Sequence, residues 1–172
     1  MTMLKLFVRD RRGASAVEFA MLLPVLLALL LGSVTVFDIF RTSQAAEKAT
    51  FTVGDMLSRN KLGLREADLN LMISFVENTV EHLGSATLRV SSISNVRGKL
   101  EVNWTKAVGN DRLSIPAVSM DGIPLVAQGD SVILTETFVP HRAFVPVGSL
   151  DQFVYHKRAV HRPRFVGKID FR

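Results

Sequence analysis

The chain has 172 residues, of which 48% are apolar and 22% charged, and its formal net charge is +5. This length accommodates one domain of ordinary size with an anchor or a tail, and it excludes a large multidomain enzyme. The chain contains no cysteine, so disulfides, thiolate metal sites and cysteine nucleophiles are excluded. Basic residues gather at both ends around a mildly acidic middle.

The first predicted element is a membrane-spanning helix. No charged residue occurs from Phe19 to Phe37, and a helix of that length, at about 1.5 Å per residue, is close to the roughly 30 Å thickness of bilayer hydrocarbon. The basic leader, residues 1–13, is expected to stay in the cytoplasm, which places the rest of the chain outside. A cleaved signal peptide is the alternative, but its apolar core is shorter, about 7 to 15 residues. The segment "TSQAAEKA", residues 42–49, offers it only a mediocre cleavage site.

Helical periodicity continues beyond this span. The spanning helix is predicted to extend outward over residues 41–60 and to break at residues 61–64, which include Gly63. A second helix is predicted over about residues 65–83, with Gly84 as its stop. The residues expected to face the core are Ala45, Ala49, Val53, Met56 and Leu57 in the first helix, and Leu69, Met72, Ile73, Val76, Val80 and Leu83 in the second.

The second half of the chain switches to the period-two pattern of β-strands. Leu88 and Val90 alternate with polar neighbours. Leu100, Val102 and Trp104 do the same. The turn-like sequence "NVRGK" lies between the two runs, so a hairpin is predicted.

Two more strands are expected after an irregular stretch. They are residues 131–139, ended by Pro140, and residues 152–158. The predicted class is therefore α+β: a long N-terminal transmembrane and amphipathic helix, a second helix and a small antiparallel sheet. The predicted division of the chain is a cytoplasmic leader at 1–13, a transmembrane helix at 14–40, and an external α+β domain with a basic tail at 41–172.

Glu18 stands directly before the apolar run. A carboxylate in bilayer hydrocarbon costs at least a few kcal/mol and tends to mark function. Arg11 and Arg12 are six or seven residues upstream, beyond the three-to-four spacing of same-face neighbours. The carboxylate could sit at headgroup level or be protonated in the membrane. Cleavage between Gly13 and Ala14 would instead create a free amine, and the amine of a packed neighbour could then satisfy Glu18.

The stretch "RRGASAVEFAMLLPVLLALLLG" resembles the processing site of type IV prepilins, and more closely the N-terminal signature of TadE-like pseudopilins of the Tad (tight adherence, Flp) pilus system. The resemblance continues more loosely through residues 53–60, 66–72 and 129–144. Two features depart from the major Flp pilins: Phe19 stands where they have tyrosine, and the external domain is far larger than theirs. The residues that match the signature are Arg12, Gly13, Ala16, Val17, Glu18, Phe19, Ala20, Pro24 and Gly32.

The resemblance implies a pilin-like architecture and a minor pilin, or pseudopilin, that takes part in assembly of a Tad/Flp-type pilus for adhesion and surface attachment. A prepilin peptidase would cut after Gly13 and leave Ala14 as the new N-terminus. Glu18, followed by Phe19, would pair with a neighbouring subunit. The implied partners are other pilins or pseudopilins, the inner-membrane Tad assembly proteins, the peptidase and membrane lipid, without nucleic acid. The implied location is the plasma (inner) membrane, crossed once by the helix that contains Phe19, Pro24, Gly32 and Phe37.

No catalytic, cofactor or metal site is predicted. The common hydrolase, metalloprotease and nucleotide-binding motifs do not occur, and the surroundings of His156 and His161 are basic, which repels a metal cation. The basic tail, residues 156–172, is expected to be a solvated strand, or to contact anionic headgroups or an acidic partner, rather than to bind nucleic acid. The main alternative function is an unprocessed single-span protein whose external domain binds a ligand or an envelope component. A membrane-tethered enzyme is a more distant alternative.

Overall fold

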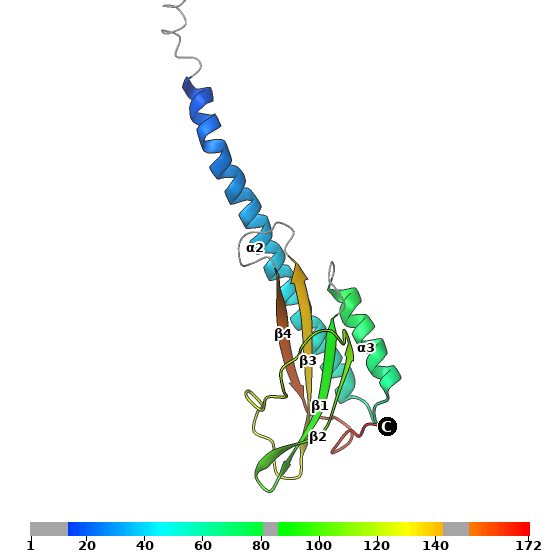
Figure 1. Ribbon diagram of the computed structural model, residues 1–172. Coiled ribbons are helices and arrows are strands. Elements are labelled where there is room, and N and C mark those ends of the chain that lie inside the picture. Colours follow the sequence, from blue (N-terminus) through cyan, green and yellow to red (C-terminus); the bar gives the residue numbers. More distant parts are fainter. Residues whose placement is uncertain (1–13, 81–85, 143–151) are drawn as a thin grey trace, which may run out of the picture.

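The computed structural model describes residues 14–80, 86–142 and 152–172 (Figure 1). Their four strands form one antiparallel sheet in the order β2-β1-β3-β4. Helices α2 and α3 pack on one face of this sheet, and the first part of α2 projects well beyond it (Figure 1). The predicted α+β class is confirmed. The elements are α2 (Ala14–Ser58), α3 (Glu66–Thr79), β1 (Thr87–Val96), β2 (Lys99–Gly109), β3 (Ser131–Arg142) and β4 (Gln152–His161).

Helix α2 has two parts with different surroundings. Its large apolar side chains are exposed up to Phe37, whereas one stripe of the later part packs against the sheet. Ala49, Val53 and Leu57 are buried as predicted, and Ala45 is partly buried. Met56 was expected in the core but is 46% exposed, because it points about 100° away from Leu57 around the helix.

Helix α3 is shorter than predicted. It ends at Thr79 rather than Leu83, since the backbone at Val80 is extended and its side chain is buried in the core. The expected stop at Gly84, like Leu83 itself, lies outside the described residues. The expected inward face is confirmed in the described part of the helix, where Leu69, Ile73, Val76 and Val80 are buried and Met72 is partly buried.

Strands β1 and β2 form the predicted hairpin. Its turn contains Arg97 and Gly98 at φ values of 53° and 84°, as a tight two-residue hairpin turn requires. The register between the strands shifts opposite Asn103, which is left over as an extra residue. Leu100 and Trp104 therefore pack in different core clusters on opposite faces of the sheet. The expected unbroken alternation along β2 is wrong for this reason.

Strand β3 continues through Pro140, where it was expected to end. Strand β1 pairs with β3 only as far as Phe138, and beyond that residue β3 has β4 as its pairing strand. Proline lacks an N–H and is tolerated where a strand is paired on one side. Strand β4 runs past the predicted end at Arg158 to His161, because it pairs with β3 along its whole length.

The irregular segment 110–130 covers the face of the sheet opposite the helices. Val126 is buried there with Ile93, Val132 and Leu134 from the strands. Val118, Met120 and Ile123 are partly buried against the same cluster. The sheet therefore has a core on each face, although only one face carries helices.

A buried carboxylate fastens this segment to the sheet. Glu136 is 1% exposed, and its oxygens lie 2.7 Å from Arg89 Nε and 2.9 Å from His156 Nε2. Arg89 also donates to the Pro116 carbonyl. Arg158, 3.4 Å from the same carboxylate, donates to the carbonyls of Ser119 and Asp121. The guanidinium groups of Arg89 and Arg158 thus link the buried Glu136 carboxylate to the backbone of the irregular segment 110–130.

The basic C-terminal segment is attached to the core by a few of its residues. Ile169 is 1% exposed, and its carbonyl accepts a hydrogen bond from Trp104 Nε1 at 2.9 Å. Phe171 forms a bridge with Leu64 in the linker between the helices. The expectation of a solvated strand holds for most of these residues, which are exposed or partly exposed, but it missed the burial of Ile169. Basic residues of this region pair within the domain, as Lys157–Glu47, Arg158–Glu136, Arg162–Asp130, Arg164–Asp55 and Lys168–Asp170.

Truncation of the buried tail side chain tests this packing. We expect Ile169→Ala to lower the free energy of unfolding by about 2–4 kcal/mol, because it leaves a cavity between the tail and the sheet. Leu125→Ala is the control, since Leu125 is 94% exposed and its truncation should change stability by less than about 0.5 kcal/mol. Denaturant unfolding in detergent measures both. Equal stability of the two variants would contradict the packed tail.

Candidate functional site

The projecting part of α2 is the most unusual surface of the molecule. Among the described residues, one helix, α2, is long and apolar enough to cross a membrane. Only 6% of its most apolar stretch of 18 residues is buried in the protein. Exposed large side chains of this density need an apolar environment, either lipid or other helices. This surface is the candidate functional site.

The predicted site residues are spread along this helix. Ala14 is the first residue of α2, and Gly13 lies outside the described residues. Glu18 and Phe19 are exposed near the start of the helix, and Phe37 is 69% exposed where the span was expected to end. At about 1.5 Å per residue, Glu18 and Phe37 are roughly 28 Å apart, so the helix does not bring them together.

Pro24 and Gly32 lie between them. Helix α2 is continuous through Pro24, which agrees with the tolerance of membrane helices for proline. A Cβ added at Gly32 would meet no atom within 4 Å. The space beside Gly32 is therefore open to a neighbouring helix or to lipid.

Glu18 has no ion-pair partner within residues 14–80, 86–142 and 152–172. Its carboxylate is exposed on a surface that is otherwise apolar. Within the described part of the chain, the sheet and α3 lie far from the first turns of α2 (Figure 1). A stabilising charge would have to come from elsewhere, and a second chain is one source.

Side chains of β3 and β4 contact α2 directly after its apolar part. The Tyr155 hydroxyl donates to the Ile39 carbonyl at 2.8 Å. His141 Nε2 lies 3.7 Å from the Asp38 carboxylate. The His141 ring also packs against Phe153 and Tyr155, with centroid distances of 5.0 and 5.4 Å. These contacts attach Asp38 and Ile39, directly after the apolar run, to the C-terminal end of β3 and the N-terminal end of β4.

Further along, α2 approaches the sheet very closely. Thr50 hydrogen-bonds to Thr137 across the interface. A Cβ at Gly54 would lie 2.3 Å from His161 Nδ1, so any other residue there would displace the His161 ring. Burial lowers the pKa of His161, with the Asp55 carboxylate acting in the opposite direction. A neutral imidazole therefore packs against the helix at this point.

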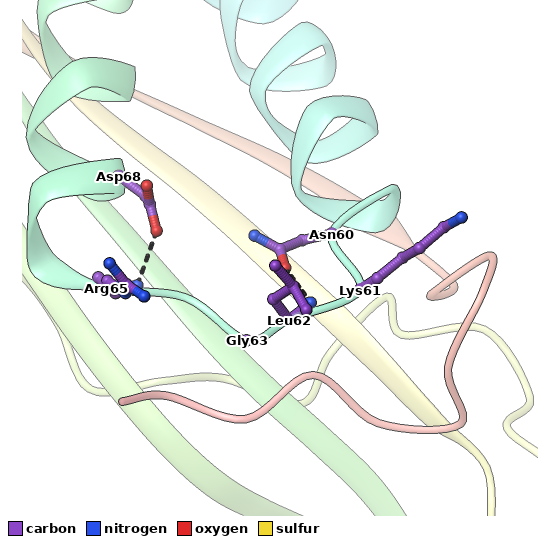
Figure 2. A pocket seen from close by; sticks show the side chains of 6 residues that line it. All are labelled: Asn60, Lys61, Leu62, Gly63, Arg65 and Asp68. Atoms are coloured by element: carbon purple, nitrogen blue, oxygen red, sulfur yellow. Dashed lines mark hydrogen bonds between the residues drawn. The ribbon is translucent and has the colours of Figure 1, made fainter.

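A shallow pocket lies at the other end of α2, where the linker enters α3 (Figure 2). Its lining residues are Asn60, Lys61, Leu62, Gly63, Arg65 and Asp68. No group of three or more histidine, cysteine, aspartate or glutamate side chains that could hold a metal ion occurs in the part of the chain that the structure describes.

A long exposed apolar helix that docks by its second part on an α+β domain defines the class: a protein with an N-terminal apolar helix that is a candidate membrane anchor. Residues 13–54 match the family described as TadE-like protein. The match runs from the glycine before α2 to Gly54, which faces His161 of the sheet, and it confirms the resemblance seen in the sequence: this segment is similar to TadE-like proteins. No curated protein and no solved structure matches the chain.

The contact between the domain and α2 can be tested through the Tyr155 hydroxyl, which donates to the Ile39 carbonyl. Burial, and then the nearby Asp38 carboxylate, raise the pKa of Tyr155 to about 12. Because the folded pKa exceeds the unfolded one, the free energy of unfolding should be maintained below pH 10 and should fall as the pH rises toward 12.

Tyr155 is the only tyrosine of the chain, so tyrosinate absorbance reports on it alone. We expect the folded protein to titrate near 12, and Asp38→Asn to lower that midpoint in part. A midpoint at the ordinary value of 10.0 in the folded protein would contradict the contact.

Proposed function

We propose that this protein is a membrane-anchored pseudopilin that takes part in assembly of a Tad/Flp-type pilus, which serves adhesion and surface attachment. The observation that carries the proposal is the TadE-like match at residues 13–54. It falls on a helix whose apolar side chains are exposed and whose start bears Glu18. A surface of this kind is suited to packing against the equivalent helices of other subunits.

In this proposal the chain is processed before assembly. A prepilin peptidase cuts after Gly13, and Ala14 then carries a free amine at the start of α2. That amine pairs with the Glu18 carboxylate of a neighbouring subunit. A buried charge becomes tolerable once it is paired, and the requirement for a partner sets the register between helices.

The proposed location is the plasma (inner) membrane, with the leader in the cytoplasm and the domain outside. The basic residues before the span support this orientation. The proposed partners are other pilins and pseudopilins, the inner-membrane Tad assembly proteins, the peptidase and lipid. The role is structural rather than enzymatic, in keeping with a functional surface made of apolar helix.

The structure weighs against a cleaved signal peptide. Its cleavage site would fall in residues 42–49, which belong to the part of α2 that docks on the sheet. Ala46 and Ala49 are fully buried there. Cleavage at this site would remove part of the core, whereas cleavage after Gly13 would leave it intact.

Replacement of Glu18 separates the pseudopilin from an unprocessed single-span protein with an external binding domain. We expect Glu18→Ala to reduce surface pili at least about tenfold while membrane insertion is unchanged, because loss of one partner leaves a buried charge unpaired. Electron microscopy and membrane fractionation measure the two effects. Glu47→Ala is the matched control, since Glu47 lies on the same helix beyond the span and is exposed. Normal piliation in the Glu18 variant would overturn the pairing.

A further inference from the structure

Backbone hydrogen bonds hold the linker that lines the pocket at the membrane-distal end of α2. The Leu64 N–H donates to the Asp170 carbonyl at 2.8 Å, and the Arg172 N–H donates to the Leu64 carbonyl at 2.8 Å. Gly63, at a φ of 87°, lets the two segments approach, since an added Cβ would lie 3.0 Å from the Asp170 carbonyl oxygen. The linker and the C-terminal segment therefore form one surface.

Three cations border this pocket. Lys61 and Arg65 line it, and Arg172 Nε lies 3.3 Å from where a Gly63 Cβ would be. Within the described residues, none of the three forms an ion pair with a carboxylate. Asp68 is the one acidic residue of the lining, and its carboxylate accepts the Arg65 backbone N–H at 2.9 Å. The three cationic groups are therefore available to pair with carboxylates of a ligand.

Exposed apolar side chains accompany the cations. Leu62 is 75% exposed and Phe165 is 59% exposed. Lys61 Nζ lies 4.3 Å from the centre of the Phe165 ring, which holds the lysine in place. Figure 2 shows Lys61 extending on one side of the linker and Arg65 lying at the start of α3 on the other, with Leu62 between them. Charges spaced in this way suit an extended ligand better than a single small anion.

We propose that this surface binds an extended acidic segment of a partner polypeptide. Carboxylates of the segment pair with Lys61, Arg65 and Arg172, and an apolar side chain of the segment contacts Leu62 and Phe165. The proposal needs neither Glu18 nor processing at Gly13, so its test is independent of the pilus assignment.

Distance excludes anionic lipid as the occupant. From Phe37 to Ser58, α2 rises roughly 32 Å at about 1.5 Å per residue. Attraction between exposed charges is screened beyond about 8–10 Å at physiological salt. The pocket therefore faces away from the membrane that α2 spans, toward whatever lies beyond it.

Binding of a decaglutamate peptide to the full chain in neutral detergent micelles tests the proposal by fluorescence anisotropy. We expect Lys61→Glu/Arg65→Glu to weaken the association at least about tenfold, because two attractions become repulsions. The matched control is Arg97→Glu/Lys99→Glu, which makes the same charge change at the exposed β1–β2 turn and should weaken it less than about threefold.

Three results would overturn the proposal. One is the absence of binding to the unmodified protein, and another is an equal loss in both variants, which would mean general attraction to a basic protein. The third is tighter binding of a ten-nucleotide DNA strand that the Lys61/Arg65 change abolishes, which would mean phosphate recognition. If the double charge reversal fails to fold, Lys61→Gln/Arg65→Gln should weaken decaglutamate binding in the same direction, and unchanged binding in it would also contradict the site.

Discussion

The close docking of the second part of α2 on the sheet is the constraint on which the rest of the structure depends. Gly54 permits the approach, and the Thr50–Thr137 and Tyr155–Ile39 hydrogen bonds hold it. Because α2 is one continuous helix, the same contacts fix the direction in which its exposed apolar part leaves the domain. The domain therefore determines where the exposed apolar part begins and along which line it leaves the sheet.

The opposite face of the sheet is built by a different principle. There a segment without regular structure is held by guanidinium groups of Arg89 and Arg158, which are in turn held by the buried Glu136. A buried ionic cluster is weak evidence for stability, and removal of one partner leaves a costly unpaired charge. We regard its role as fixing the position of the segment 110–130, which leaves both faces of the sheet covered.

Local patterns in the sequence predicted much of this fold. The apolar run, the Gly13-to-Phe19 motif, the inward face of α3 and the β1–β2 hairpin each depend on neighbouring residues. The bulge at Asn103 and the continuation of β3 through Pro140 depend on which strands pair, and the pairing partner is distant in sequence. The Tyr155–Ile39 contact, the Glu136 cluster and the burial of Ile169 likewise join residues far apart in the chain. No spacing rule within one segment could have found them.

If the chain is a pseudopilin, as we propose, its assembly begins with cleavage at the start of α2. The most direct test is the intact mass and N-terminal residue of the protein recovered from membranes, with and without the cell's prepilin peptidase. We expect a chain that begins at Ala14 only when the peptidase is present. A chain that still carries residues 1–13 in the presence of the peptidase would contradict it and would favour an ordinary anchored domain.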